Sequence, residues 1–246
     1  QAETERLRSS LLSSVSHDLR TPLAVITGAS SSLLRSDESL ASETRRELCQ
    51  TIYDDARRLS RLVDNLLDMT KIESRGVKIN RQWNVVEEVV GSALNRMKSQ
   101  LGGRQVVTHV PSELALASFD DVLIEQVLIN LLENVVKYTP PGTPVEITAR
   151  QEPEQIVIAV ADRGPGLGPG EDERVFEKFY RGSAAAADGR SGAGLGLAIC
   201  KAIVAAHGGR IWAENRSGGG AQISFSLPLI EKPPAISAET ALAGQE

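Results

Sequence analysis

The sequence contains few cysteines and few aromatic residues, and these shortages exclude several classes of protein. Its two cysteines stand far apart, at positions 49 and 200, with no clustered histidines beside them, so neither a disulfide framework nor a cysteine-based metal site is expected. Aromatic residues make up 4% of the chain and the formal net charge is -5, whereas a nucleic-acid binder usually has a basic face and stacking aromatics. We therefore expect a small ligand or a protein partner, and no nucleic acid.

Long hydrophobic runs are also missing. No stretch approaches the roughly 18 to 20 apolar residues that a membrane-spanning helix needs, and no signal peptide opens the chain. We therefore expect the chain itself to be soluble, to make no membrane contact and to lie in the cytoplasm. Because it begins at Gln1 rather than at Met, we also expect it to be a fragment of a longer protein.

Apolar residues recur at alternating steps of three and four in two segments near the N-terminus, as in the seam of a coiled coil. The first seam consists of Leu12, Val15, Leu19, Pro22, Ile26, Ala29 and Leu33. The second consists of Leu48, Ile52, Asp55, Leu59, Leu62, Leu66 and Met69, with Val63 and Leu67 beside it. The pattern predicts a helical hairpin connected by the polar stretch 35–43. Stripes this wide stay partly wet in a hairpin of about 70 residues, so we expect dimerisation into a four-helix bundle.

The helical period ends near residue 76, where Ser74 and Gly76 interrupt it. Beyond this point, amphipathic helices are predicted over 85–101 and 119–138, and half-buried strands over 144–150, 155–161, 210–215 and 221–229. Short connections between most of the strands favour a two-layer α+β domain, with helices on one face of a mixed sheet, over a doubly wound parallel sheet. The sequence therefore divides into a hairpin (1–76), an α+β domain (77–229) and a flexible C-terminal tail (230–246).

Three glycine-rich clusters lie in the predicted α+β domain, at 162–170, 192–199 and 217–225. A single cluster of this kind is usually a turn, but the contexts differ. The first follows a predicted strand, so the carboxylate of Asp162 comes at a strand end, where it can point into a pocket and read a base. The second opens a helix whose N-terminal amides attract anions, and Gly194 and Gly196 let a ligand approach the backbone. The segment 171–191 between them is placed where a mobile lid would close over a nucleotide, with a solvated loop as the plainer alternative.

The predicted helix 119–138 carries two asparagines on one face. Asn130 and Asn134 are four residues apart, and their amide oxygens suit a hard cation such as Mg²⁺, which also keeps waters and substrate phosphates in its shell. Lys137 offers a counter-charge for phosphate, and Tyr138 offers a flat ring for a base. An ordinary polar helix face is the alternative for this helix alone. Beside the glycine clusters, a site for a nucleotide and Mg²⁺ is favoured.

Six segments, taken in order, make the sequence resemble the sensor histidine kinases of two-component signalling. They are "SVSHDLRTPL" (14–23), "NLLENVVKYT" (130–139), "DRGPGLG" (162–168), "VFEKFYR" (175–181), "GAGLGLAI" (192–199) and "GGGAQISFSLP" (218–228). Within this family, the segments 83–94 and 194–209 are similar to the potassium-sensing kinases of the bacterial Kdp transport system. The resemblance implies a homodimeric protein kinase that uses ATP and Mg²⁺ and has the receiver domain of a response regulator as its partner. It also implies a longer sensor that is anchored in the inner membrane.

The resemblance further implies a fold and individual residue roles. The ATP-binding domain would have the histidine kinase, Hsp90 and topoisomerase type of fold. Its nucleotide-binding residues would be Asn130, Asn134, Lys137, Tyr138, Asp162, Gly164, Gly166, Arg181, Gly194, Leu195, Gly196 and Leu197, with Asn130 as the metal ligand. In similar kinases, the residue at Asp162 bonds the adenine amino group and the residue at Tyr138 lies beside the adenine.

Gln126 bears on the alternative that the chain is a plain ATPase of the topoisomerase and chaperone type. In hydrolysing relatives of this fold, a glutamate four residues before the metal-binding asparagine activates water, whereas Gln126 is a neutral amide that cannot act as this base. The sequence therefore favours a kinase that keeps the γ-phosphate for a protein nucleophile. A third alternative is a non-catalytic dimeric scaffold, or a phosphatase-only module, that retains the fold.

Four residues of the phosphoacceptor-like segment are expected to have separate roles in phosphoryl transfer. The heptad that places Val15 at position d puts His17 at position f, away from the seam and exposed to an arriving ATP domain. A neutral imidazole has a nitrogen lone pair for in-line attack on the γ-phosphoryl group, and Asp18 can hold the N–H of the other ring nitrogen. In similar kinases, the residue at Thr21 supports dephosphorylation of the regulator. Pro22 loosens the helix because it lacks an N–H.

Overall fold

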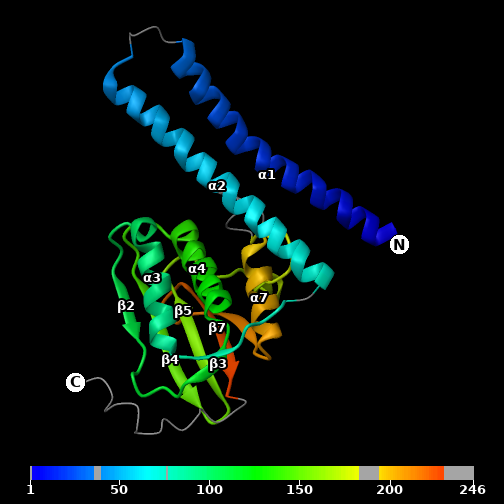
Figure 1. Ribbon diagram of the computed structural model, residues 1–246, viewed down its shortest axis with the longest axis vertical. Coiled ribbons are helices and arrows are strands. Elements are labelled where there is room, and N and C mark those ends of the chain that lie inside the picture. The colour runs from blue at the N-terminus through cyan, green and yellow to red at the C-terminus, as the bar shows by residue number, and fades with distance from the viewer. Residues whose placement is uncertain (1, 36–39, 76, 183–193, 230–246) are drawn as a thin grey trace, which may run out of the picture. The chain divides into compact units, whose positions relative to one another are not determined.

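A computed structural model describes residues 2–35, 40–75, 77–182 and 194–229 (Figure 1). For residues 2–18, 61, 68, 69 and 71–75, the description covers the backbone alone. The chain forms two compact units, one made of the residues up to Lys78 together with Pro165–Ala202, and one made of Ile79–Gly164 together with the residues from Ile203 onward. The predicted division at residues 76 and 229 stays a prediction, and the predicted tail lies outside the described residues.

The predicted helical hairpin is confirmed. In Figure 1, α1 (Ala2–Arg35) and α2 (Ser42–Arg75) lie side by side and run in opposite directions. Pro22, Ala29 and Leu62, which all belong to the predicted seams, are buried. Because α1 continues through Pro22 without a break, the loosening expected at this proline stays a prediction.

Large apolar side chains of the hairpin remain exposed in the single chain. In its described part these are Leu23, Val25, Leu34, Tyr53, Val63 and Leu67. Val63 and Leu67 are the residues expected to widen the second stripe, and they are 42% and 51% exposed. The hairpin alone therefore leaves these apolar stripes partly exposed to water, as the width of the apolar pattern predicts.

The second unit is built on a five-stranded mixed sheet (Figure 1). Its order is β2-β4-β5-β7-β6, in which β2 (Val106–His109) runs parallel to β4 (Val145–Glu152) and the other neighbouring strands are antiparallel. The other three strands are β5 (Gln155–Ala161), β6 (Ile211–Asn215) and β7 (Ala221–Pro228). The four strands predicted from the sequence are confirmed as β4 to β7.

Two helices pack against each other on one face of this sheet (Figure 1). They are α3 (Val86–Leu101) and α4 (Asp121–Tyr138), which begin and end within two residues of the predicted positions. Their buried apolar residues recur at steps of three and four, and each fully buried side chain contributes about 1.5–3 kcal/mol. On α3 these residues include Val86, Val89, Val90, Ala93, Met97 and Leu101, and on α4 Ile124, Val127, Leu128, Leu131 and Val135. The predicted two-layer α+β arrangement is therefore confirmed.

Two further strands and two further helices belong to the described residues. β1 (Gln82–Asn84) and β3 (Ala117–Phe119) pair antiparallel in a small sheet of their own. α5 (Glu171–Arg174) is one helical turn at the start of the segment predicted as a lid, and residues 183–191 of that segment lie outside the description. The helix predicted at the second glycine cluster is confirmed as α7 (Gly196–Ala206).

A buried histidine joins the start of α4 to two other segments of the second unit. His207 is 1% exposed; its Nε2 accepts a hydrogen bond from the backbone N–H of Asp120 (3.1 Å), and its Nδ1 donates to the carbonyl of Ile203 (2.8 Å). The carboxylate of Asp120 caps the first turn of α4 and also accepts from the backbone N–H of Asn80 (2.9 Å). The neutral ring of His207 is thus part of the contact network that fixes the start of α4.

We expect the free energy of unfolding to fall as the pH drops below 6.5, the ordinary pKa of histidine, and His207 to cause part of this fall. Burial lowers the pKa of His207, and the positive charge of Arg81 lowers it further. The hydrogen bond to Ile203 and the negative charge of Asp120 raise this pKa, but by less. The unfolded chain therefore binds a proton at a pH where the folded chain does not. This difference costs up to about 1.4 kcal/mol per pH unit, until the pH reaches the folded pKa.

Urea unfolding between about pH 7.5 and about pH 5 measures this dependence. His207→Gln should remove the part of the slope that His207 contributes, because the glutamine side chain does not titrate. His109→Gln is the matched control, since His109 is exposed at the end of β2. An unchanged slope in His207→Gln would contradict the assignment.

Candidate functional site

The predicted phosphoacceptor residues lie in α1. His17 and Asp18 occupy consecutive positions of this helix, and their side chains are outside the description. Thr21, one turn later, is exposed, while the adjacent seam residues Leu19 and Pro22 are half-buried and buried. The helix therefore presents Thr21 away from the seam, and the roles of His17 and Asp18 stay predictions.

The predicted metal ligand lies on α4 beside a residue that orients it. Asn130 is 4% exposed, and its Oδ1 accepts a hydrogen bond from Nε2 of Gln126, one turn earlier, at 3.2 Å. Because an amide has one oxygen and one nitrogen, this bond fixes which way the Asn130 side chain points. Gln126, a neutral amide, therefore holds Asn130 in place.

The amide nitrogen of Asn134 shows that this face of α4 is incomplete by itself. Nδ2 of Asn134 is buried, and it has no hydrogen-bond partner among the described residues. A buried donor left in this state costs about 1–3 kcal/mol, so an oxygen of a bound ligand is the expected acceptor. A phosphate oxygen could accept this hydrogen bond. The amide oxygen of Asn130 is of the oxygen-ligand type that Mg²⁺ prefers. The two asparagines therefore fit a magnesium nucleotide.

The last turn of α4 places a positive charge against an aromatic ring. Lys137 and Tyr138 are both half-buried, and Nζ of Lys137 lies 4.7 Å from the centroid of the Tyr138 ring. This separation is within the range of a cation–π interaction. The sequence assigned these residues to phosphate and base separately, whereas in the structure they also contact each other.

Arg104, a residue that the sequence did not identify, fixes the end of α4. Its guanidinium donates to Oγ1 of Thr139 (2.7 Å) and to the backbone carbonyls of Thr139 (3.1 Å) and Thr143 (3.2 Å). Thr139 is 3% exposed, and its backbone N–H donates to the carbonyl of Val135. Carbonyl groups at a helix end lack partners within the helix, so Arg104 supplies donors where the backbone has none. This contact holds the turn that carries Lys137.

The first glycine cluster packs against the same end of α4. Asp162 directly follows β5, and its Oδ1 accepts hydrogen bonds from the backbone N–H groups of Gly164 (2.7 Å) and Ala221 (3.2 Å). A Cβ at Gly164 would lie 2.8 Å from Cγ2 of Thr139, so only glycine allows this approach. No described residue donates to Oδ2 of Asp162, which can therefore accept from a ligand amino group. The second unit thus brings Asp162 and Gly164 to the end of α4 that carries Tyr138.

The second glycine cluster belongs to the first unit and closes on the segment before it. Gly194 of this cluster and Gly166 of the first cluster have positive φ angles of 64° and 77°, in the left-handed region that favours glycine. A Cβ at Gly194 would lie 2.6 Å from the carbonyl oxygen of Tyr180, and the carbonyl of Gly194 accepts from the backbone N–H of Phe179 (2.9 Å). The cluster therefore requires glycine at residue 194 for backbone packing, independently of any ligand.

The other predicted residues of this unit lie beside that contact. Leu195 is buried, Gly196 begins α7, and Leu197 and Arg181 are half-buried. Residues 183–193, between Arg181 and the cluster, are outside the description, so the predicted lid is not described beyond Gly182. The predicted nucleotide-binding residues therefore fall into two sets, one in each unit.

Glu171 is a second residue that the sequence did not identify. Its side chain is 7% exposed, its Oε2 accepts from the backbone N–H of Gly168 (2.9 Å), and its Oε1 accepts from the hydroxyl of Tyr180 (3.1 Å). Burial raises the pKa of Tyr180, and the carboxylate of Glu171 raises it further. Glu171 therefore ties the first glycine cluster to the segment 175–181. In the sequence it is one of several acidic residues in a row, a pattern typical of a solvated surface.

Two protein families match the chain, one over the helical hairpin and one over the α+β part that follows it. The family described as "His Kinase A (phospho-acceptor) domain" matches residues 7–75, which span the helical hairpin. The family described as "Histidine kinase-, DNA gyrase B-, and HSP90-like ATPase" matches residues 119–231, which include α4, the glycine clusters and the strands β4 to β7. These matches confirm the fold type predicted from the sequence.

Similar curated proteins include two named sensor protein KdpD. The one from Clostridium acetobutylicum is 42% identical over 228 residues, which are 93% of this chain and 25% of that protein. The one from Escherichia coli strain K12 is 44% identical over 235 residues, which are 94% of this chain and 26% of that protein. The chain therefore spans about a quarter of the length of these relatives.

Solved structures of similar chains include a complex with a nucleotide analogue and a complex with a protein. Full-length ShkA in complex with AMPPNP is 27% identical, with a TM-score of 0.65 over 91% of this chain and 46% of that chain. Histidine kinase ThkA in complex with response regulator protein TrrA shares the fold at 24% identity, with a TM-score of 0.69 over 91% of this chain and 64% of that chain. No helix among the described residues is both long and apolar enough to cross a membrane.

Proposed function

Because the chain belongs to the sensor histidine kinases, we propose that His17 takes the γ-phosphoryl group of ATP and passes it to an aspartate in the receiver domain of a response regulator. The observation that carries this proposal is the presence of a phosphoacceptor hairpin and an ATPase domain in one chain. The hairpin is the match to residues 7–75 and the ATPase domain is the match to residues 119–231.

The step assigned to His17 is an in-line substitution at phosphorus. One ring nitrogen forms a bond to the γ-phosphorus, the bond to the β–γ bridging oxygen breaks, and ADP leaves with that electron pair. Asp18 would accept the N–H of the other ring nitrogen and support the positive charge that develops on the ring. In the second step, a carboxylate oxygen of the regulator attacks the same phosphorus, and the imidazole leaves.

The nucleotide is assigned to the face of α4 and to the end of β5. Asn130 would hold Mg²⁺, Asn134 and Lys137 would bind the phosphates, and Tyr138 and Asp162 would bind the adenine. The buried Nδ2 of Asn134 supports this assignment, because it needs an acceptor that the described residues do not supply. When bound, Mg²⁺ neutralises charge on the phosphate oxygens.

We further propose that the chain is a homodimer whose hairpins form a four-helix bundle. The exposed apolar residues of α1 and α2 support this, since they include Tyr53, Val63 and Leu67, which are 57%, 42% and 51% exposed. A second copy would remove the exposed part of these side chains from water. Full burial of an apolar side chain gains about 1.5–3 kcal/mol, and each of these gains only a part of that because it is already partly buried. A solution mass equal to one chain, measured by light scattering, would contradict the dimer.

Incubation with γ-labelled ATP separates this function from its two alternatives. A histidine kinase places an acid-labile, alkali-stable label on the chain, and this is the expected result. A plain ATPase of the topoisomerase and chaperone type releases free phosphate without labelling the protein, and a non-catalytic scaffold does neither. The bond between Gln126 and Asn130 supports the kinase over the ATPase, because a neutral amide that already donates to Asn130 is no base for water.

The labelled chain also allows a test of Thr21, which is assigned to dephosphorylation of the regulator. Its exposed position on α1, one turn after His17, supports this role. With a phosphorylated receiver domain as substrate, Thr21→Ala should slow the loss of phosphate while labelling of the chain by ATP continues. A variant that no longer labels itself would instead place Thr21 in the kinase step.

The similarity to KdpD supports a narrower proposal, that the longer protein takes part in potassium-dependent signalling in the cytoplasm through a regulator of the same system. Rates of phosphoryl transfer from the labelled chain to a panel of receiver domains measure this. Transfer to the regulator of the potassium system should be the fastest. A faster transfer to another receiver domain would contradict the narrower proposal and leave the kinase activity standing.

A further inference from the structure

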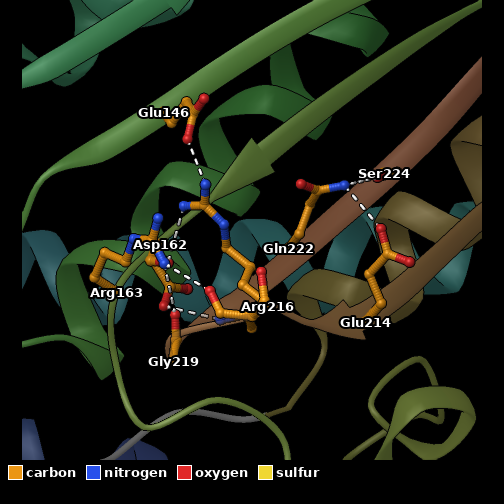
Figure 2. A network of polar contacts seen from close by, with 10 residues as sticks. Glu146, Asp162, Arg163, Glu214, Arg216, Gly219, Gln222 and Ser224 are labelled. Carbon is orange, nitrogen blue, oxygen red and sulfur yellow. Dashed lines mark hydrogen bonds and ion pairs between the residues drawn. The ribbon is translucent and has the colours of Figure 1, made fainter.

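The third glycine-rich cluster, to which the proposed function gives no role, forms the turn between β6 and β7 (Figure 2). Residues 216–221 are called the β6–β7 turn below. The turn closes on itself: the backbone N–H of Arg216 donates to the carbonyl of Gly220 (2.9 Å), and that of Gly219 donates to the carbonyl of Arg216 (3.2 Å). It is therefore a compact element that can hold a neighbouring strand end at a fixed distance.

Its glycines let the backbone of the turn come unusually close to Asp162. Gly218, Gly219 and Gly220 have φ angles of 84°, 96° and 95°, in the left-handed region. A Cβ at Gly220 would overlap the carbonyl oxygen of Asp162 and lie 2.7 Å from its carbonyl carbon. Glycine is thus required at residue 220 both for the backbone conformation and for the approach.

The turn holds both the backbone and the side chain of Asp162. The backbone N–H of Asp162 donates to the carbonyl of Ala221 (2.9 Å), and the N–H of Ala221 donates to Oδ1 of Asp162 (3.2 Å). With the N–H of Gly164 as the second donor to Oδ1, this oxygen is engaged by backbone groups alone. The orientation of Oδ2, the oxygen to which no described residue donates, therefore depends on the position of the turn.

An ion pair ties the turn to β4 and to Asp162 (Figure 2). Nη2 of Arg216 lies 2.5 Å from Oε2 of Glu146, and Nη1 of Arg216 donates to the carbonyl of Asp162 (3.3 Å). The Arg216 and Glu146 side chains are 18% and 33% exposed, so the pair is partly shielded from water. On the other side, Nη1 of Arg163 donates to the carbonyls of Ser217 (3.1 Å) and Gly219 (3.4 Å). Arg216, which is itself part of the turn, therefore joins the turn both to β4 and to Asp162.

We propose that Arg216, held by Glu146, is a positioning residue that sets the carboxylate of Asp162 and so determines the preference of the site for a base with an exocyclic amino group. The proposal rests on the proposed function, in which Asp162 bonds the adenine amino group. Arg216 does not touch the base in this scheme; it acts through the turn and through the carbonyl of Asp162. A displaced turn withdraws the Ala221 donor, and Oδ1 and Oδ2 can then exchange places.

Binding of two nucleotides to the full chain tests this. ATP carries the 6-amino group, and purine riboside triphosphate lacks it but keeps the ring and all three phosphates. In Arg216→Met, the affinity for ATP should fall about tenfold, while the affinity for the analogue should change less than about twofold, so the ratio between them collapses. Glu146→Gln should lower the same ratio through the other partner of the ion pair. The double variant should add little to either change, because both act on one contact.

Arg150→Met is the matched control. Arg150 forms an ion pair with Glu152 on the same sheet (3.0 Å) and is 58% exposed, and no described contact joins it to Asp162. This variant should bind both nucleotides as the unmodified chain does. Equal weakening of both nucleotides in Arg216→Met and Glu146→Gln would reduce Arg216 to general support of the fold and overturn the proposal, as would an unchanged ratio. An unmodified chain that binds neither nucleotide, or that does not distinguish them, would instead contradict the proposed function.

Discussion

Replacement of His17 by alanine is expected to reduce the acid-labile label that the chain takes from γ-labelled ATP to background. The chain has three histidines, at positions 17, 109 and 207. The ring of His207 is 1% exposed, and both of its nitrogens are engaged, one by the N–H of Asp120 and the other by the carbonyl of Ile203. His207 therefore has no free ring nitrogen that could accept a phosphoryl group, unless the hydrogen bonds that fix the start of α4 break. Only His17 and His109 remain as acceptors.

His109 provides the matched control for this experiment. It is exposed at the end of β2, so its ring is accessible and its replacement disturbs no buried contact. His109→Ala should therefore keep full labelling, while His17→Ala should keep the thermal stability and the ATP affinity of the unmodified chain. Label that persists in His17→Ala and disappears in His109→Ala would move the phosphoacceptor to the sheet and contradict the proposed function of the hairpin.

Asn130→Ala is expected to lower the rate of labelling by about 100-fold or more, because stabilisation of phosphate charge by a bound metal is worth several kcal/mol. The substitution removes the amide oxygen assigned to Mg²⁺ and leaves Nε2 of Gln126 without its acceptor. The side chain of Asn130 is 4% exposed, so its removal also leaves a gap in a buried part of the unit. The measurement is the initial rate of labelling as a function of the Mg²⁺ concentration.

Asn95→Ala serves as the control, since Asn95 is an exposed asparagine on α3 of the same unit. It should label at the normal rate with the normal dependence on Mg²⁺. Asn130→Asp keeps an oxygen at the same place and should recover part of the activity, which separates loss of the ligand from loss of the fold. Normal labelling by Asn130→Ala at low Mg²⁺ would rule out its metal role.

The longer helices and strands could be predicted from the sequence, because their patterns of apolar residues extend over enough positions to be recognised. α3, α4 and the strands β4 to β7 each span five residues or more, and all of them were predicted. β1, β2 and β3 have three or four residues each, which is too short for alternation to stand out. The small antiparallel pair β1–β3 depends on a contact between residues 82–84 and 117–119, and no local pattern encodes it.

In the candidate site too, residues in local patterns could be predicted from the sequence, and contacts between distant residues could not. Asn130 and Asn134 were predicted because four residues are one helical turn, and Asp162 because it ends an apolar strand. Arg104 and Arg216, which lie beside these residues, were not predicted, since their contacts join distant parts of the chain. Arg104 meets Thr139 across 35 residues, and Arg216 meets Glu146 across 70. The contact of Arg216 follows from the topology of the sheet, which brings β4, β5 and the β6–β7 turn together.

The position of Arg104 also changes the electric field at the C-terminal end of α4. A helix carries about half a negative charge at its C-terminus, and that charge by itself repels phosphate. The guanidinium of Arg104 donates directly to the carbonyls that generate this charge, at Thr139 and, at 3.4 Å, at Val136. The positive charge of Arg104 therefore opposes the half-charge at the end of the helix. The ammonium group of Lys137 in the last turn has the same sign and opposes it as well.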